Sequence, residues 1–345
     1  MGNMVDSILP AFRRLDGRVI ILEMLMISGL LTTGHSQSIT ITSQPLPQTD
    51  CYGNHVEFSI GITGSIGTVL YQWQQKPPGG NFSDIIDANN ALLNVDNIGV
   101  NKQNVNGTEY RVVVIDDCGP ITSDQALLSV NSITDLTPGV VNSIICDGGS
   151  MTYKVFTEGY VIDNGYQWAW NNGSGWTFLS DEGVYSGTTT SQLSISDATT
   201  AQNGSYRVSV RFNTLNQPRG DSTCIETSST RVRNLLVRAP LSPPIISASQ
   251  QICYGNVPCI LTATKSTGGS GPDYSYRWQI SYDGLNYTDI SGANNLSYSP
   301  AALTASTYFR ILSDDSGSPD CGTVYSVPVL ISVSPLPNTS SIFHR

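Results

Sequence analysis

Basic side chains are scarce in this sequence. The 345 residues include four lysines and three histidines, only 13% of residues are charged, and the formal net charge is −10. Without a basic patch the chain has nothing to neutralise a phosphate backbone, so the composition argues against nucleic-acid binding. The same acidic, weakly charged surface argues against adhesion to anionic lipid.

Sequence signatures of catalysis are missing as well. Three histidines are too few for a His-based zinc site or an acid–base pair. The chain has no Gly-x-Ser-x-Gly nucleophile elbow, no phosphate-binding loop and no metalloprotease helix. The sequence therefore predicts a protein that is not an enzyme and needs no cofactor.

Apolar runs are short, and the longest follows a basic N-terminal stretch. Arginines at positions 13, 14 and 18 precede the run 19–31, and the small residues at 34 and 36 then form a plausible cleavage site. This order predicts a secretory signal peptide over 1–36; an amphipathic N-terminal helix or a misassigned start is the alternative. No other stretch approaches 18 apolar residues, so we expect no membrane insertion after cleavage and a secreted, extracellular or outer-surface location.

Landmarks recur three times along the rest of the chain, about a hundred residues apart. Each repeat has a cysteine that opens a Gly/Asn turn, then a Tyr-x-Trp step, then an aromatic-Arg-aliphatic step, then a closing cysteine. The opening cysteines are Cys51, Cys146 and Cys253; the tryptophans are Trp73, Trp168 and Trp278; the aromatics before arginine are Tyr110, Tyr206 and Phe309; the closing cysteines are Cys118, Cys224 and Cys321.

Each repeat has the pattern of a β-sandwich. Strong helix formers are scarce, Val56, Phe58 and Ile60 alternate with polar residues, and turn signals fall about every ten residues. With the Cys…Trp…Cys order, these features predict an all-β chain of three tandem immunoglobulin-like sandwiches. We expect the domains at 37–132, 133–240 and 241–335, with a linker-like tail at 336–345. The tryptophans and the aromatics before arginine are the expected core.

The cysteines predict one disulfide inside each repeat. The expected pairs are Cys51–Cys118, Cys146–Cys224 and Cys253–Cys321, each closing a loop of about 70 residues and contributing about 3–4 kcal/mol. Paired cysteines also fit an oxidising compartment. The seventh cysteine, Cys259, is predicted to be a buried apolar thiol, and a pairing of Cys259 with Cys321 stays open.

Two groups of residues allow a ligand. Acidic pairs follow two of the aromatic-Arg strands and could hold calcium, although a solvated turn is the favoured explanation because the second repeat lacks the pair: Asp116, Asp117, Asp314 and Asp315. Trp170 and Trp176 could stack on sugar rings. Trp176 aligns with Phe82 and Tyr287, however, and Trp170 shares the face of Trp168, so packing positions are the favoured interpretation of both.

At these landmarks the chain resembles the immunoglobulin-like and PKD-like repeats of large secreted surface proteins of gliding bacteria. The resemblance covers residues 37 to about 335. It implies a non-catalytic, adhesin-type stalk or spacer, or a scaffold that binds a surface protein or a glycan. The alternative is a carbohydrate-binding accessory module of a secreted polysaccharide-degrading system.

Overall fold

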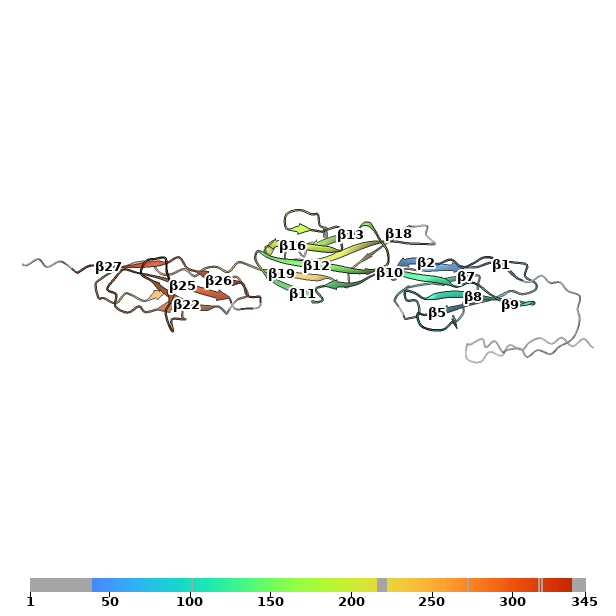
Figure 1. Cartoon of the computed structure of the whole chain (residues 1–345), viewed down its shortest axis with the longest axis horizontal. Helices are drawn as coiled ribbons and strands as arrows, with labels where there is room; N and C mark the ends of the chain where they lie inside the picture. The colour runs from blue at the N-terminus through green and yellow to red at the C-terminus, as the bar shows by residue number, and fades with distance from the viewer. Residues whose placement is uncertain are drawn as a thin grey trace, which may run out of the picture. The chain divides into compact units, whose positions relative to one another are not determined.

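The computed structural model of the chain describes residues 39–100, 102–215, 222–271, 273–315, 317 and 319–336. Within them every regular element is a β-strand, apart from the short 3-10 helix η1 (Thr200–Gln202). The all-β prediction is therefore confirmed (Figure 1). The predicted signal segment, 1–36, lies outside the described residues, as does the predicted tail beyond residue 336.

The first repeat is a sandwich of mostly antiparallel strands, in which β2 pairs with β10 in parallel. One sheet is built on β5 and β8, with β6, β9, β2 and the start of β10 added to it; the pairs β1–β4 and β3–β7 face that sheet. The strands are β1 (Thr40–Ser43), β2 (Gln48–Cys51), β3 (Val56–Ser59), β4 (Gly61–Thr63), β5 (Leu70–Lys76), β6 (Ser83–Asp84), β7 (Leu92–Val95), β8 (Glu109–Asp116), β9 (Gly119–Thr122) and β10 (Ala126–Thr137).

The second repeat has the same arrangement. Its sheet order is β11-β19-β17-β13-β14, with β18 added to β17, and β12, β16 and β15 form the opposing layer. The strands are β11 (Asn142–Cys146), β12 (Gly149–Glu158), β13 (Val161–Asn171), β14 (Thr177–Phe178), β15 (Tyr185–Ser186), β16 (Gln192–Ala198), β17 (Gly204–Asn213), β18 (Thr223–Thr227) and β19 (Arg233–Arg238).

The third repeat has the same two layers. Its sheet order is β20-β27-β25-β22-β23, with β26 added to β25, and β21 pairs with β24 in the opposing layer. The strands are β20 (Gln250–Cys253), β21 (Leu261–Thr262), β22 (Ser275–Ser281), β23 (Thr288–Asp289), β24 (Ser297–Tyr298), β25 (Thr307–Asp315), β26 (Gly322–Tyr325) and β27 (Val329–Ser334).

Two compact units make up the chain. The first comprises Met1–Ser132 together with Glu158–Tyr160 and Arg211–Glu226, two segments that the sequence assigns to the second repeat. The second comprises Ile133–Thr157, Val161–Val210 and Thr227–Arg345. The predicted domain boundaries, 37–132, 133–240 and 241–335, stay a prediction.

The core of each sandwich forms around one indole. Trp73 on β5, Trp168 on β13 and Trp278 on β22 have no exposed surface. Each indole N–H donates a hydrogen bond to a backbone carbonyl, at 2.8–2.9 Å, so the ring is buried without an unpaired polar atom. The aromatics before arginine, Tyr110, Tyr206 and Phe309, are buried beside it.

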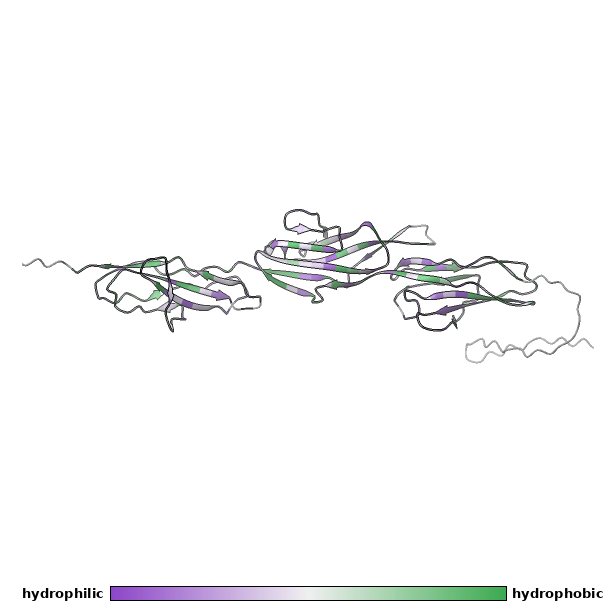
Figure 2. Ribbon diagram, in the orientation of Figure 1, coloured by the Kyte–Doolittle hydropathy of each residue, from purple (hydrophilic) through white to green (hydrophobic). Residues whose placement is uncertain are grey.

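Alternation along the strands explains why these residues form sandwiches. In β8 every second residue is buried, and the same period of two holds through most of β17. Figure 2 shows hydrophobic and hydrophilic residues alternating along the strands. The buried Phe58 ring of β3 stacks on Tyr110 of β8 with ring centroids 4.7 Å apart, so the two layers meet through aromatic contacts.

Candidate functional site

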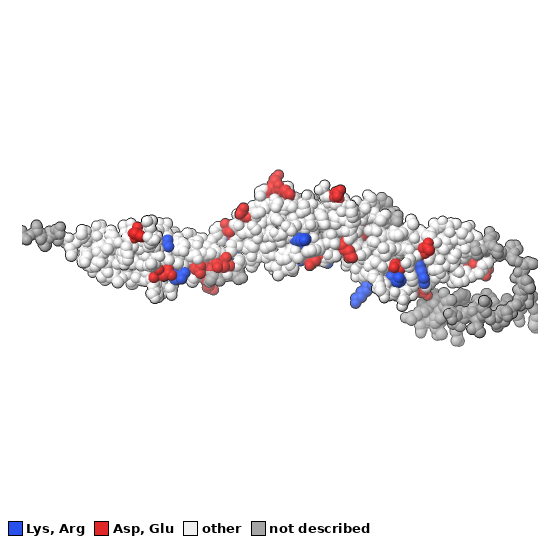
Figure 3. Space-filling view, viewed as in Figure 1, with Lys and Arg blue, Asp and Glu red and all other residues white. Residues whose placement is uncertain are grey.

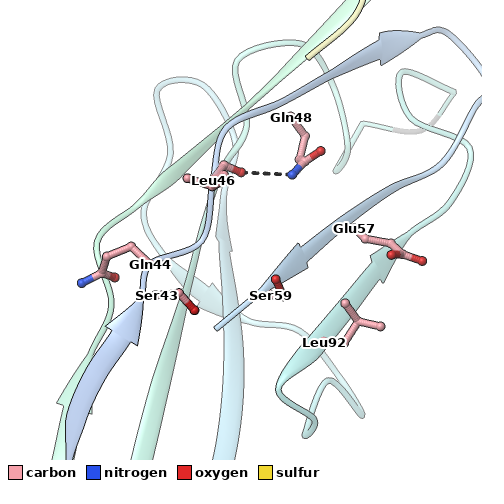
Figure 4. Close-up of a pocket in the computed structure, with 7 residues that line it drawn as sticks. All are labelled: Ser43, Gln44, Leu46, Gln48, Glu57, Ser59 and Leu92. Atoms are coloured by element: carbon pink, nitrogen blue, oxygen red, sulfur yellow. Dashed lines mark hydrogen bonds between the residues drawn. The ribbon is translucent and has the colours of Figure 1, made fainter. Parts of the chain in front are cut away.

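A hollow of about 290 Å³ lies on the first repeat (Figure 4). Its lining consists of Ser43, Gln44, Leu46, Gln48, Glu57, Ser59 and Leu92. Glu57 is the one titratable side chain among these seven, so the lining lacks the acid–base pair that hydrolytic chemistry needs. The volume also falls at the lower edge of the range for small-molecule sites. The hollow therefore gives no support to an enzymatic function.

The acidic pair of the first repeat caps a turn. Asp116 is buried, and its two carboxylate oxygens accept backbone N–H bonds from Ile66 at 3.0 Å and from Cys118 at 2.8 Å. The N–H of Ile66 is the main reason that the pKa of Asp116 is held below its ordinary value. Asp117 is exposed beside it. The buried carboxylate thus orders the hairpin turn between β8 and β9.

The acidic pair of the third repeat does the same. Asp315 has no exposed surface and accepts backbone N–H bonds from Ser270 and Gly317. Asp314 accepts a hydrogen bond from the hydroxyl of Thr323 across the hairpin. These contacts give both aspartates a role in turn geometry. Calcium at either acidic pair stays an untested prediction.

One group of potential metal ligands lies close together within the described ranges: Asp50, Cys51 and Cys224. The two sulfur atoms are joined in a disulfide and offer no thiolate to a metal. Asp50 in turn accepts hydrogen bonds from the backbone N–H of Cys51 at 2.7 Å and from the Asn54 amide at 2.8 Å. This group is therefore a structural element of the disulfide.

The two candidate sugar-binding tryptophans lie in different surroundings. Trp170 is half-buried near the end of β13, and its indole N–H donates to the Asn203 carbonyl at 3.3 Å. Its expected burial alongside Trp168 is therefore only partial. Trp176 is half-buried under the guanidinium of Arg207, whose carbon lies 4.1 Å from the ring centroid. An arginine thus occupies one face of the Trp176 ring, where a sugar would otherwise stack.

The same stacking recurs in the other repeats. Arg111 lies 3.9 Å from the ring centroid of Phe82, and Arg310 lies 3.9 Å from that of Tyr287. The position of Trp176 is thus a packing position that every repeat fills with an aromatic ring and covers with an arginine.

The disulfides do not follow the predicted pairing. Cys51 is bonded to Cys224, and Cys146 is bonded to Cys321. The expected pairs Cys51–Cys118, Cys146–Cys224 and Cys253–Cys321 are therefore wrong. Each observed bond joins the opening cysteine of one repeat to the closing cysteine of the next.

Three cysteines are left as free thiols: Cys118, Cys253 and Cys259. All three are exposed, so the prediction of a buried Cys259 is wrong. Cys259 also has no bond to Cys321, the alternative that the sequence left open. Gln250 on β20 holds the Cys259 backbone by hydrogen bonds to its N–H and its carbonyl, at 2.8 and 3.1 Å.

Strand register explains why a bond inside one repeat is excluded. In the first repeat Cys51 lies opposite Asn131 of β10, at the end of the sandwich where β8 begins. Cys118 lies in the turn that follows the other end of β8. β8 has eight residues, which at about 3.4 Å each separate its ends by ~25 Å. A disulfide requires Cα atoms about 4.4–6.8 Å apart. The two cysteines of one repeat therefore lie at opposite ends of its sandwich.

The bond between Cys51 and Cys224 lies among further contacts in the first unit. Thr49 and Leu215 exchange two backbone hydrogen bonds of 3.1 and 3.2 Å. The buried Asn131 side chain donates to the Asn213 carbonyl at 2.7 Å. The hairpin around Cys224 is thus fixed to β2 and β10 by backbone and side-chain bonds as well as by sulfur.

The bond between Cys146 and Cys321 lies in the second unit. Cys146 pairs with Arg238 at the end of the parallel strands β11 and β19. Cys321 follows the turn that the Asp315 carboxylate orders. The second disulfide therefore joins the same two structural positions as the first.

Charge is sparse on the face drawn in Figure 3, where acidic side chains outnumber basic ones on a mostly uncharged surface. Two salt bridges are present in the part of the chain that the structure covers: Lys76–Glu109 at 3.1 Å and Arg277–Asp289 at 3.4 Å. Among the described residues no helix is long and apolar enough to cross a membrane.

One family model matches the third repeat. Residues 242–335 match a family described as a Domain of unknown function (DUF8696). No curated protein sequence matches the chain.

Similar solved structures are tandem-domain proteins. They include titin domains A168–A170 (15% identity, 87% of this chain, 100% of that chain, TM-score 0.34). The three N-terminal domains of the bacteriophage RB49 Highly Immunogenic Outer Capsid protein also match (14% identity, 87% and 100% coverage, TM-score 0.40). A third is Sidekick-1 immunoglobulin domains 1–5 (14% identity, 86% and 59% coverage, TM-score 0.30). The strand order of this chain identifies its repeats as immunoglobulin-like β-sandwiches.

Proposed function

We propose that the chain is a secreted or cell-surface protein without catalytic activity, which acts as an adhesin-type spacer. The observation that carries the proposal is the pairing of opening and closing cysteines from successive repeats. A covalent bond at each junction limits how far neighbouring sandwiches bend or separate, which is a useful property in a stalk and serves no catalytic purpose.

The disulfides also support the proposed location. Disulfides persist in oxidising compartments, outside the cytosol. If these cysteines were reduced, no covalent bond would link one repeat to the next. Sandwich ends present loops, so a partner on another surface, either a protein or a glycan, would bind there. The rival role in polysaccharide degradation needs an accessible aromatic platform, and Arg207 covers one face of the Trp176 ring.

Small-angle X-ray scattering of the full chain tests the spacer role. We expect the oxidised chain to scatter as a particle with restricted conformations. The variant Cys146→Ser/Cys321→Ser is expected to show a broader distribution of the radius of gyration with unchanged β-sheet circular dichroism. A matched control is Cys259→Ser, which removes a thiol that forms no disulfide.

Two results would contradict the proposal. One is identical scattering of the oxidised chain and the Cys146→Ser/Cys321→Ser variant, because the junction bond would then restrict nothing. The other is glycan-array binding that Trp170→Ala or Trp176→Ala abolishes without loss of folding, which would favour the carbohydrate-binding role.

A further inference from the structure

The two disulfides of the chain follow one rule. The opening cysteine of the first repeat bonds the closing cysteine of the second, and the opening cysteine of the second bonds the closing cysteine of the third: Cys51–Cys224 and Cys146–Cys321. The sequence separations, 173 and 175 residues, are nearly equal, as expected for equivalent positions in a repeated module. The rule leaves two cysteines without a partner in the chain, Cys253 and Cys118.

Cys253 has the same backbone position as the two bonded opening cysteines. All three end a short strand that pairs in parallel with the last strand of the repeat: Cys51 with Asn131, Cys146 with Arg238 and Cys253 with Ser334. The two earlier cysteines are bonded from this position, whereas the Cys253 thiol is free and exposed. Cys253 therefore has the position of an opening cysteine, but the third repeat holds no free closing cysteine to bond with it.

Cys118 has the complementary position. It lies in the hairpin turn between β8 and β9, and the carboxylate of Asp116 accepts its backbone N–H. In the third repeat, Cys321 lies in the turn between β25 and β26, which Asp315 orders, and is bonded. The Cys118 thiol is free and exposed. One chain thus carries both halves of the junction, one in its first repeat and one in its third.

We propose that Cys253 of one copy of this chain forms a disulfide with Cys118 of a second copy. The partner is a second copy because the chain itself supplies an unbonded closing cysteine in the required turn. The contact is head-to-tail, so it uses a different surface on each copy and leaves one free cysteine at either end of every oligomer. Repetition extends the internal disulfide pattern from one molecule to the next.

The bond requires an oxidant, which we name as a small-molecule or protein disulfide such as oxidised glutathione. The thiolate of one cysteine attacks the oxidant and forms a mixed disulfide, releasing one reduced thiol. The thiolate of the other cysteine then displaces the second thiol and completes the bond. In sum two cysteine thiols give one disulfide, and the oxidant takes up two electrons and two protons.

A mixing experiment with single variants tests this pairing. The full chain is incubated in a glutathione redox buffer and analysed by non-reducing electrophoresis and by mass spectrometry of linked peptides. We expect the unaltered chain to form a ladder of oligomers, and Cys118→Ser and Cys253→Ser each to lose it. Mixed together, the two variants retain one Cys253 and one Cys118 between them, so they are expected to give a dimer and nothing larger.

Cys259→Ser is the matched control, because it removes the third free thiol and is expected to keep the full ladder. The linked peptide is expected to join Cys253 to Cys118, while Cys51–Cys224 and Cys146–Cys321 stay intact. Retention of these two bonds also shows that each variant has folded.

Several results would overturn the proposal. They are a monomeric chain at every protein concentration, links of Cys253 to Cys253 or to Cys259, and a mixture of the two variants that yields no dimer. Capture of Cys253 by a cysteine of a different protein, with no Cys118 link, also overturns it. None of these results touches the internal disulfides, so the proposed spacer role stands or fails separately by the scattering experiment.

Discussion

At the scale of single residues, the repeated arginine joins a strand to the loop beside it. Arg111 donates from Nε to Gln74 at 2.8 Å while its guanidinium stacks on Phe82. Arg310 donates from Nε to Gln279 at 2.6 Å. In both repeats the arginine thus satisfies its buried N–H and covers an aromatic ring with the same side chain.

The second repeat keeps the stacking and loses the hydrogen bond. Arg207 stacks on Trp176, but its buried Nε has no hydrogen-bond partner. The cause lies in the sequence: glutamine follows Trp73 and Trp278, whereas Ala169 follows Trp168. A buried donor without an acceptor costs about 1–3 kcal/mol, so this position weakens the second sandwich.

Removing the glutamine from the first repeat and adding one to the second are predicted to have opposite effects on the free energy of unfolding. Gln74→Ala removes the acceptor of Arg111 and is expected to lower the free energy of unfolding of the first repeat by about 0.5–1.5 kcal/mol. Ala169→Gln supplies an acceptor to Arg207 and is expected to raise that of the second repeat by a similar amount. Hydrogen exchange in β8 and β17 measures each repeat separately. A loss of protection in β17 on Ala169→Gln would contradict the account, because it would mean that the site has no room for the side chain.

At the scale of elements, each repeat contains a loop held by an aspartate. Asp116 caps the β8–β9 turn, the Asp181 carboxylate accepts the N–H and the hydroxyl of Thr188, and the Asp283 carboxylate accepts the N–H groups of Leu285 and Asn286. The pKa of each of the three carboxyls is lowered, chiefly by its bonds from Ile66, Thr188 and Asn286 respectively.

These loops predict a loss of stability in acid. A carboxyl whose pKa is lower in the folded than in the unfolded chain binds its proton more readily when unfolded. The stability that such a carboxyl contributes is therefore complete above its pKa in the unfolded chain, about 4, and is lost as the pH falls through its pKa in the folded chain. We expect the urea midpoint to fall between pH 5 and pH 2, and Asp283→Asn to reduce that fall.

The control for the acid prediction is Asp117→Asn, which removes the same charge from a position as exposed as that of Asp283. It is expected to leave the dependence of the urea midpoint on pH unchanged. If Asp117→Asn and Asp283→Asn altered that dependence equally, net charge would be the cause and the hydrogen-bonded loop would not.

The sandwich elements could be predicted from sequence because their signals are local. Alternation placed Phe58 on a strand, the Tyr-x-Trp step placed Trp73 in a strand facing the interior, and the residues before arginine fell opposite it. The cover over Trp176 could also have been found, because the aromatic position and the arginine recur together in all three repeats. The partial exposure of Trp170 could not have been predicted. Alternation along a strand tells which face a side chain is on but does not tell how far the opposing layer covers that face.

At the scale of the whole molecule, the pairing of cysteines was beyond the sequence pattern. Repetition makes Cys118 and Cys224 equivalent, so spacing alone cannot decide which of them bonds Cys51. The decision comes from strand register, which separates the opening and closing cysteines of one repeat by the full length of β8, β17 or β25. A strand order drawn for one repeat would have placed its opening and closing cysteines at opposite ends of the sandwich. Such a drawing would have excluded the predicted pairs.

The observed pairing has an unusual consequence for a chain under tension. The loop closed by Cys51–Cys224 and the loop closed by Cys146–Cys321 overlap, because residues 146–224 belong to both. The shortest covalent route under tension crosses both disulfides and runs backwards through residues 146–224, so the two bonds together bypass about 190 residues. Either bond alone shortens the covalent route by nearly as much, 173 or 175 residues.

Single-molecule pulling on the full chain tests this connectivity through its non-additivity. Removing one bond, by Cys51→Ser/Cys224→Ser or by Cys146→Ser/Cys321→Ser, is expected to lengthen the fully unfolded chain by only about 60 Å. Removing all four cysteines is expected to lengthen it by roughly 650 Å relative to the unaltered chain, at about 3.5 Å per residue. Bonds confined to single repeats would enclose separate loops, and each removal would then add its own length. Equal, additive increments from the two double variants would therefore reject the overlapping pattern, and with it the rule that joins each repeat to the next.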